Sequence, residues 1–459
     1  MIEGNPSQGH AQCHARGGGG KRHTVHHVLG FMRNRLPGQL VLQYTDRCNA
    51  TCPQCGMRRT NTFDRSKITM ETARKIIDAA AQRGIAALSF TGGEPLLFAD
   101  EIIPLIHYAV EAGIPYVRTG TNGFLFMGAH RPGFEKRIAH LAQALVQSGL
   151  YTFWISIDTY DPAVHEKMRG LPGVIEGIRK AVPIFHEQGF YPSANLGINK
   201  SIAAAAGLED ITPGNPRQYY AAFREGFRKF FAFVHDLGFT IVNVCYPMSL
   251  DEKKDGGLEA VYGATSTDEV VRFTQAERVL VFQALLDTII EFRSRIRIFS
   301  PQCSLYSLIR DYTEGKDKSY PCRGGWEYFF IDARDGNIYP CGYRGKENLG
   351  KFWEFLPNGQ YRKDVCKACD WECFRDPSEM FGPVLTLFRQ PGRFIGMLRQ
   401  ERAFMKLWFQ DMLYYAACNF FNGRKAPCYH KMRRFNRLSD EKENCPLSGK
   451  ELAKKGQSP

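Results

Sequence analysis

Three cysteines in one short loop are the first residues of this sequence that could do chemistry. Cys48, Cys52 and Cys55 stand in the stretch YTDRCNATCPQCGMRR, directly after the apolar run LVLQYT. Zinc sites and ordinary ferredoxin-type clusters take four protein ligands, and no fourth cysteine lies nearby. Three thiolates can hold three irons of a 4Fe–4S cluster and leave the fourth iron open. A chelating amino-carboxylate, such as the methionyl end of S-adenosylmethionine, would fill that open position.

An alternation of strand and helix patterns must position this loop. Short β-branched or aromatic runs occur at 39–45, 87–92, 116–121, 152–158, 193–199 and 240–246. The segments between them carry apolar residues at three- and four-residue spacing, and most close on glycine, as helices do. This rhythm predicts a parallel sheet with right-handed crossovers, and therefore an α/β fold with a partial (β/α)6 TIM-like barrel.

Long irregular segments follow two of these predicted strands. Residues 200–216 and 250–270 would lie at the C-terminal rim of a barrel, where substrates bind. The second segment leads to Thr274 and Glu277, whose spacing predicts a capping box at the start of a long helix.

The cysteine loop after a first barrel strand resembles that of the radical S-adenosylmethionine (radical SAM) enzymes. Motifs after the next three strands agree with the resemblance: TGGEP at 91–95, TNG at 121–123 and SIDTYDPAVHEKMRG at 156–170. The resemblance implies a 4Fe–4S cluster on the three cysteines, and an electron donor such as flavodoxin or ferredoxin. It also implies S-adenosylmethionine contacts from Gly92, Gly93, Glu94, Asn122, Ser156 and Arg169. In one departure, Gln54 stands where the family usually carries an aromatic residue near the adenine.

A second cysteine group follows the predicted barrel. WEYFFID at 326–332, the turn RDGN and IYPC at 338–341 predict a hairpin between Cys322 and Cys341. The hairpin resembles the SPASM or twitch extension of some radical SAM enzymes. That resemblance implies one auxiliary 4Fe–4S cluster, held by Cys322, Cys341 and two of Cys366, Cys369 and Cys373.

Two alternatives to this cluster remain open. A second auxiliary cluster would have to recruit among Cys418, Cys428 and Cys445. A zinc site on the C-x2-C pair is the other, because spacing alone does not separate zinc from iron.

Composition indicates an ordinary globular protein. The chain has 459 residues, of which 44% are hydrophobic and 23% charged. Its first residues are polar and glycine-rich, which indicates neither a signal peptide nor a membrane span, so we expect a cytoplasmic protein whose clustered cysteines bind metal rather than form disulfides. We predict four segments: a flexible arm 1–37, the barrel 38–300, an auxiliary-cluster domain 301–380 and a basic helical segment 381–459.

The last segment is basic and amphipathic. Between Arg393 and Arg437 the sequence has ten Lys and Arg residues but only two acidic residues. One helical face carries Met397, Phe404, Trp408, Met412 and Tyr415, which predicts packing on the protein body, with peripheral contact to a membrane surface as the alternative. Lys406 and Asp411 argue against a bilayer-spanning helix.

These features predict a radical SAM oxidoreductase that dehydrogenates or cross-links its substrate. The alternatives are a maturase of ribosomal peptides, an enzyme acting on a sugar, an antibiotic intermediate or a lipid, and a non-catalytic iron–sulfur or zinc protein that binds nucleic acid. We expect no nucleic acid partner. No catalytic residue is assigned: Cys245, Tyr246 and Tyr343 are candidates by chemistry only, and we expect Cys245 to be buried packing.

Overall fold

The computed structural model describes residue 32 and residues 35–204, 215–250, 257–315, 320–355 and 366–435. Most of the predicted N-terminal arm, which contains Cys13, and the segment that contains Cys445 lie outside these ranges. So do parts of both predicted rim segments, 205–214 and 251–256.

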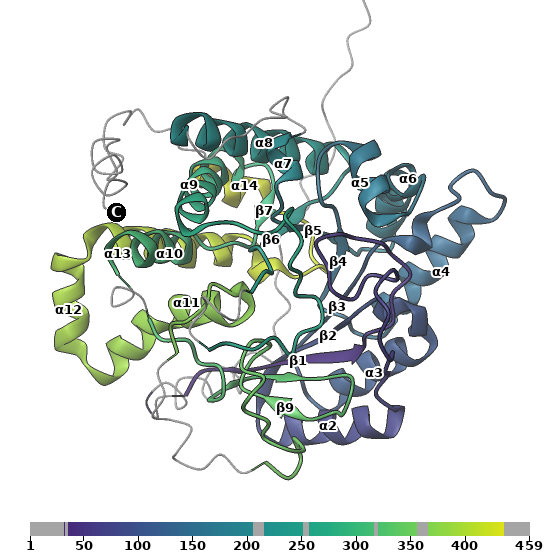
Figure 1. Ribbon diagram of the computed structural model, residues 1–459, viewed down its shortest axis with the longest axis horizontal. Helices are drawn as coiled ribbons and strands as arrows, with labels where there is room; N and C mark the ends of the chain where they lie inside the picture. Colours follow the sequence, from purple (N-terminus) through teal and green to yellow (C-terminus); the bar gives the residue numbers. More distant parts are fainter. Residues whose placement is uncertain are drawn as a thin grey trace, which may run out of the picture.

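A nine-stranded sheet forms the centre of the molecule (Figure 1). The strands are β1 (Gly38–Thr45), β2 (Ile85–Gly92), β3 (Tyr116–Thr121), β4 (Thr152–Ser156), β5 (Ser193–Gly197), β6 (Ile241–Cys245), β7 (Arg297–Ile298), β8 (Tyr328–Ile331) and β9 (Ile338–Tyr339). Their order is β7-β6-β5-β4-β3-β2-β1-β8-β9, and every neighbouring pair is parallel except β8 and β9. The predicted partial (β/α)6 TIM-like barrel is confirmed in β1 to β6.

Helices connect the strands and cover the outside of the sheet (Figure 1). Those of the barrel are α2 (Met70–Gln82), α3 (Ala99–Glu111), α4 (Phe134–Gln147), α5 (Pro162–Arg169), α6 (Val174–Glu187), α7 (Ser201–Ala204), α8 (Pro216–Asp236) and α9 (Gln275–Phe292). Thr274 and Glu277 form the predicted capping box at the start of α9. The helices that follow are α10 (Gln302–Glu314), α11 (Glu372–Arg389), α12 (Pro391–Gln400), α13 (Arg402–Ala417) and α14 (Tyr429–Met432).

The two faces of the barrel strands differ in polarity. In β4, Phe153 and Ile155 are buried in the core shared with the helices, whereas Trp154 and Ser156, which point the other way, keep partial exposure. The same alternation places polar side chains on the inner face of the other strands: Gln39, Gln43, Ser89, Arg118, Asn195, Asn243 and Cys245. Bulky apolar side chains normally fill a TIM-type barrel, so a polar and partly exposed inner face is a site for a ligand.

The second cysteine group belongs to the same sheet as the barrel. β8 pairs in parallel with β1, from Gln39 opposite Tyr328 to Leu42 opposite Ile331. β8 and β9 form the predicted antiparallel hairpin, and Gly336 takes a φ of 65° in its turn. The hairpin therefore holds its cysteines at a fixed place beside β1.

The basic segment packs on the protein body, as predicted. The run is two helices, α12 and α13, which separate at Glu401 (φ −113°, ψ 43°). Phe404 and Trp408 are buried, and Met397, Met412 and Tyr415 pack against the same cluster. Among the helices that the structure describes, none combines the length and the hydropathy needed to span a bilayer.

Candidate functional site

The three-cysteine loop is held in place by Arg65. Its guanidinium donates to four backbone carbonyl oxygens: those of Asp46 at 2.7 Å, Met57 at 2.9 Å, Arg58 at 2.9 Å and Asn61 at 2.8 Å. One charged group thus satisfies the carbonyls of a loop that has no regular secondary structure to do so.

The segment after β6 closes over the other side of this loop. The Gly56 N–H donates to the Ala264 carbonyl at 3.3 Å, and the Ser266 hydroxyl donates to the Pro53 carbonyl at 2.9 Å. A Cβ atom at Gly56 would lie 2.4 Å from the Gly263 carbonyl oxygen, so only glycine allows this approach. Part of the predicted rim segment 250–270 therefore lies at the cysteine loop.

The thiols of the loop suit an iron–sulfur cluster. Cys52 is buried, and Cys48 and Cys55 are half-buried. Burial raises the pKa of all three thiols, that of Cys55 to about 11, while the nearby Arg169 guanidinium lowers them. Within the described ranges no three His, Cys, Asp or Glu side chains converge as ligands of a single metal ion. A cluster is different, because each thiolate binds a separate iron, and iron binding displaces the thiol proton.

The glycine pair of TGGEP packs directly on the start of the cysteine loop. The Gly93 and Glu94 N–H groups donate to the carbonyls of Thr45 and Arg47, both at 2.8 Å. A Cβ at Gly93 would lie 2.2 Å from the Arg47 oxygen, and Gly92 has a φ of 153°. Both positions need glycine because the two loops touch through their backbones.

Glu94 and Asn122 join the ends of β2 and β3 at the cysteine loop. The buried Glu94 carboxylate accepts from the Asn122 N–H at 2.5 Å and from the Leu96 N–H at 3.0 Å. Burial raises the pKa of Glu94 to about 7. The Asn122 amide donates to Asn49 Oδ1 at 2.8 Å, and its nitrogen lies 3.8 Å from Cys48 Sγ. The predicted S-adenosylmethionine contacts of β2 and β3 thus lie beside the first cysteine.

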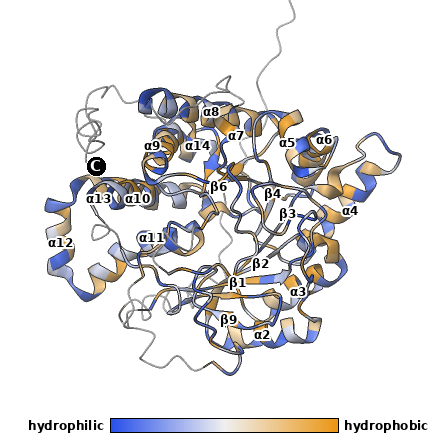
Figure 2. Ribbon diagram, in the orientation of Figure 1, coloured by the Kyte–Doolittle hydropathy of each residue, from blue (hydrophilic) through white to orange (hydrophobic). Residues whose placement is uncertain are grey.

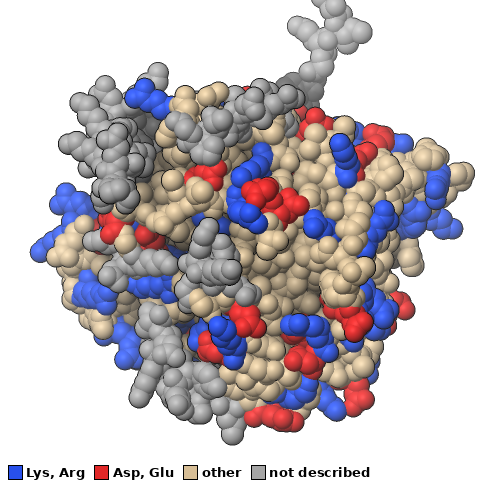
Figure 3. All heavy atoms as spheres, in the orientation of Figure 1, with Lys and Arg blue, Asp and Glu red and all other residues tan. Residues whose placement is uncertain are grey.

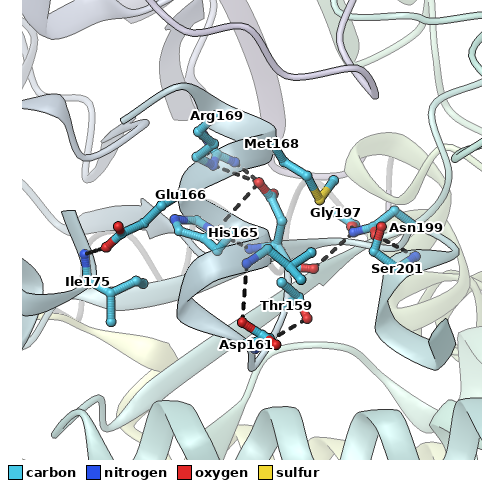
Figure 4. A network of polar contacts seen from close by, with 12 residues as sticks. Thr159, Asp161, His165, Glu166, Met168, Arg169, Ile175, Gly197, Asn199 and Ser201 are labelled. Carbon is cyan, nitrogen blue, oxygen red and sulfur yellow. Dashed lines mark hydrogen bonds and ion pairs between the residues drawn. The ribbon is translucent and has the colours of Figure 1, made fainter. Parts of the chain in front are cut away.

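Arg169 is oriented by an aspartate that the sequence analysis did not assign. Its Nε and Nη2 atoms donate to the two oxygens of Asp158, each at 2.7 Å (Figure 4). Although burial favours the neutral acid, Arg169 holds the pKa of Asp158 below its usual range. The Asp158 N–H donates to His165 Nδ1 at 3.1 Å, and burial lowers the pKa of His165 to about 4, so this imidazole is neutral.

Several polar groups around the loop have no hydrogen-bond partner in the described chain and are therefore available to bind a ligand. The Nη1 atom of Arg169 makes no hydrogen bond to any described residue. Gln43 Oε1, Asp46 Oδ2 and Gln54 Oε1 are buried acceptors without a donor in the described chain. Buried polar atoms are rarely left unpaired. A ligand with a carboxylate for the guanidinium and an ammonium group for the acceptors, such as S-adenosylmethionine, fits this arrangement, with Ser156 on the inner face of β4.

Four cysteines of the second group line one small pocket. These are Cys322 and Cys341 from the hairpin and Cys366 and Cys369 from the segment before α11. The Cys322 N–H donates to the Cys366 carbonyl at 2.9 Å, which fixes the two segments together. Backbone N–H groups lie 3.4 Å from Cys322 Sγ and from Cys341 Sγ. Four thiols in one pocket are a complete protein ligand set for a 4Fe–4S cluster, whereas within the described ranges they do not converge as ligands of a single zinc ion.

Cys373 is not among the residues that line this pocket. Its Sγ lies 3.7 Å from the Glu372 carboxylate, and its carbonyl accepts from the Gln39 amide at 3.0 Å. It interacts electrostatically with Arg118 of β3 and with Cys245 of β6. Cys373 therefore faces the barrel interior.

The expectation that Cys245 is buried packing is wrong. The residue is only half-buried, and its sulfur hydrogen-bonds Asn195 Oδ1 at 3.4 Å and lies 3.3 Å from Asn243 Nδ2. Because residue 245 continues the inward-facing positions of β6, its thiol points into the barrel. Strand alternation gives this inward direction, but it could not reveal the polar partners of the thiol, which come from two separate strands.

The two tyrosine candidates, Tyr246 and Tyr343, are both buried and packed against other side chains. Tyr246 is buried, and its hydroxyl donates to the Asp376 carboxylate at 3.2 Å. Tyr343 is buried against Trp371, with ring centroids 5.5 Å apart. Cys418 lies in a separate apolar cluster with Tyr414, and not in the four-cysteine pocket.

Comparison with known protein families finds a match from β1 to β5. The model of the radical SAM superfamily matches residues 42–198. An AdoMet-dependent heme synthase of Methanosarcina barkeri is 24% identical over 362 residues, which cover 75% of this chain and 87% of that protein. A GTP 3′,8-cyclase of Erythrobacter litoralis is 30% identical over 148 residues, which cover 31% of this chain but only 41% of the cyclase.

Solved structures align with this chain at low sequence identity and with TM-scores below 0.5. Streptococcus suis SuiB bound to S-adenosylmethionine aligns with a TM-score of 0.46 and 17% identity, over 75% of this chain and 71% of SuiB. The protein anSMEcpe with bound AdoMet aligns with a TM-score of 0.44 and 16% identity, over 73% of this chain and 87% of that one.

Proposed function

We propose that this chain is a radical SAM oxidoreductase with two iron–sulfur centres. Enzymes of this superfamily use a 4Fe–4S cluster and S-adenosylmethionine. We assign that cluster to Cys48, Cys52 and Cys55. When bound there, it supplies the electron that splits S-adenosylmethionine into methionine and a 5′-deoxyadenosyl radical, which removes a hydrogen atom from the substrate.

The residues around the loop have defined tasks in this proposal. Arg169, oriented by Asp158, holds the methionyl carboxylate through its free Nη1 atom. The glycine backbone at Gly93 lets the ligand approach the loop closely, and Glu94 fixes the backbone of Asn122. Buried acceptors such as Gln54 Oε1 receive the ligand's N–H groups. Together they hold the ligand in one orientation, which a radical reaction requires.

The barrel interior is the proposed substrate site. Its inner face is polar and partly exposed and includes the thiol of Cys245, and Cys373 of α11 faces it. Arg118 points inward without an ion pair in the described chain, and its Nε atom is buried without a hydrogen-bond partner. A half-buried guanidinium whose Nε atom has no partner in the described chain favours a substrate with a carboxylate or phosphate group. The named relatives act in heme and GTP chemistry, so their names do not select one substrate.

The second centre is proposed to be an auxiliary 4Fe–4S cluster on Cys322, Cys341, Cys366 and Cys369. Its place beside β1 and α11 puts it next to the barrel interior, where Glu372 and Cys373 begin α11. From there it could accept an electron from the substrate after hydrogen removal, which would make the overall reaction an oxidation or a cross-link.

One observation carries the proposal: the motifs at the ends of β1 to β4 converge on the three-cysteine loop, where a guanidinium nitrogen and three buried acceptors have no partner among the described residues. The test is anaerobic loading with iron and sulfide, followed by reduction with dithionite in the presence of S-adenosylmethionine. We expect 5′-deoxyadenosine from the wild type and none from the Cys48→Ala/Cys52→Ala/Cys55→Ala variant. An iron-loaded wild type that makes no 5′-deoxyadenosine would refute the proposal.

A further inference from the structure

Helix α13 is apolar on its inner side, where it is fixed to the protein body. Phe404, Met405 and Trp408 are buried there. Asp411 is fully buried as well, and its carboxylate pairs with the Arg293 guanidinium at 2.5 Å. This ion pair and the buried aromatic residues define which side of α13 faces the protein.

The opposite side of α13 is also apolar, although it faces solvent. Its exposed positions follow the helix at alternating spacings of four and three residues: Arg402, Lys406, Phe409, Leu413 and Ala416; Phe420 is exposed in the turn just after the helix. Phe409 is 45% exposed, Leu413 55% and Phe420 58%. Large apolar side chains that are exposed on successive turns of one helix indicate a contact surface, so the outer face of α13 from Phe409 onward is suited to a partner.

The preceding helix extends this surface. Leu387 at the end of α11 and Ile395 and Leu398 on α12 are exposed. Of the twelve large hydrophobic residues exposed in the described chain, eight lie between residues 387 and 429. Scattered exposed residues need no explanation, but a concentration of this kind marks a contact surface.

Cations stand among these apolar residues. Arg399, Arg402 and Lys406 are exposed, and none of them forms an ion pair with another described residue. The nearest acidic residue, Glu401, is engaged by Arg310 at 2.6 Å. Figure 3 shows Lys and Arg at the left edge of the molecule, and Figure 2 shows hydrophobic and hydrophilic residues mixed along α12 at the same edge.

The combination of exposed apolar residues and exposed cations indicates which kind of partner this surface binds. Two copies of the chain joined through this surface would bring like charges together, which disfavours self-association. A surface of aromatic and aliphatic side chains with interspersed Lys and Arg matches instead the boundary between acyl chains and anionic headgroups. The long cationic side chains can reach the headgroups while the apolar ones enter the acyl region.

We propose that the outer surface of α12 and α13, formed by Ile395, Leu398, Arg399, Arg402, Lys406, Phe409 and Leu413, docks the protein onto a membrane that contains anionic lipid. The contact is peripheral, because no described helix has the length and hydropathy of a membrane span. It is independent of the iron–sulfur chemistry, since none of these residues lies at the cysteine loop or in the barrel interior.

Sedimentation with lipid vesicles tests this proposal on the full-length, iron-loaded protein. We expect binding to vesicles of phosphatidylcholine mixed with phosphatidylglycerol, and at least about tenfold weaker binding to vesicles of phosphatidylcholine alone. The Phe409→Ser/Leu413→Ser variant and the Arg402→Glu/Lys406→Glu variant should each lose about tenfold in affinity for the anionic vesicles. All four side chains are exposed, so the fold should be kept, which circular dichroism would check.

A matched charge reversal on another face is the control. Arg131→Glu/Lys136→Glu at α4 changes the net charge by the same amount on exposed residues and should leave vesicle binding unchanged. Equal loss in this control, or equal binding to both kinds of vesicle, would overturn the proposal. So would absence of vesicle binding together with a dimer, detected by sedimentation velocity, that Phe409→Ser/Leu413→Ser disperses. Formation of 5′-deoxyadenosine in detergent-free solution should be the same in all variants, which separates this proposal from the catalytic one.

Discussion

The two cysteine groups differ mainly in the polar groups that surround them. The three thiols of the β1 loop have beside them a guanidinium nitrogen of Arg169 and the buried oxygens of Gln43, Asp46 and Gln54, all without partners in the described chain. The second group has four thiols in one pocket, backed by Trp371 and by backbone N–H groups near the sulfurs.

This difference indicates different chemistry at the two centres. A site with three thiols and unpaired polar groups is incomplete without a ligand, which suits the binding and cleavage of S-adenosylmethionine. A site with four thiols has no need of a further ligand and suits electron transfer.

Cys322, Cys341, Cys366 and Cys369 are called the closed group here, because four thiols complete a cluster without a further ligand. Removing one of these thiols should remove only the auxiliary cluster. We expect about eight irons in the wild type and about four in Cys369→Ala, which should still form 5′-deoxyadenosine. Cys373→Ala is the matched control: its thiol lies outside the pocket, so the iron content should stay near eight. Colorimetric iron analysis distinguishes them. If Cys373→Ala lost iron and Cys369→Ala did not, the ligand assignment would be wrong.

Adding a single methyl group by Gly→Ala substitution should affect different measured quantities at the two centres. Gly93→Ala places a Cβ 2.2 Å from the Arg47 oxygen, so the two loops must move apart. We expect the rate of 5′-deoxyadenosine formation to fall at least about tenfold. Gly324→Ala, whose Cβ would lie 2.9 Å from the Pro340 oxygen beside the closed group, should lower the iron content but not this rate. Equal rates in Gly93→Ala and wild type would contradict the close-packed ligand site.

The loop of Cys48, Cys52 and Cys55 is called the open group, because its three thiols leave room for a ligand. Arg169→Lys tests the ligand site of this group without removing a positive charge. An ammonium group cannot hold both oxygens of Asp158 and also reach a ligand carboxylate. We expect the dissociation constant for S-adenosylmethionine, measured by equilibrium dialysis, to rise about tenfold to a hundredfold at unchanged iron content. Unchanged affinity would remove Arg169 from the ligand site.

The smallest predicted effect is a pH dependence of stability near the closed group. Burial raises the pKa of Glu379 from its ordinary value of 4.5 to about 7. Between these values the folded protein keeps a proton that the unfolded chain releases, so the free energy of unfolding should fall as pH rises from about 5 to 7. Glu379→Gln should make this decline shallower by a few degrees in Tm, roughly, with exposed Glu135→Gln as control. An identical slope in all three proteins would contradict the shift.

The sequence predicted the strands and the motifs of the open group because both depend on local order. The three cysteines follow one strand and the GGEP loop follows the next. Because parallel strands end at the same edge of the sheet, these motifs must lie close together. The role of Asp158 was not predictable, because its pairing depends on where α5 returns Arg169.

Other features depend on tertiary contacts that a local pattern does not encode. Cys369 precedes α11 and Cys373 lies on its first turn, so the direction of each thiol is set by where α11 begins. The sequence therefore named both as candidate ligands. Similarly, α13 carries large apolar residues on both its inner and its outer side, and periodicity could not show that Phe409 and Leu413 remain exposed.

The central claim is that only the open group binds S-adenosylmethionine, and electron paramagnetic resonance of the reduced protein tests it most directly. Spectra would be recorded with and without S-adenosylmethionine on two single-cluster variants, Cys369→Ala and Cys48→Ala/Cys52→Ala/Cys55→Ala. We predict that the ligand shifts the signal of Cys369→Ala and leaves that of the triple variant unchanged. A shift in the triple variant, or none in an iron-loaded Cys369→Ala, would contradict the account.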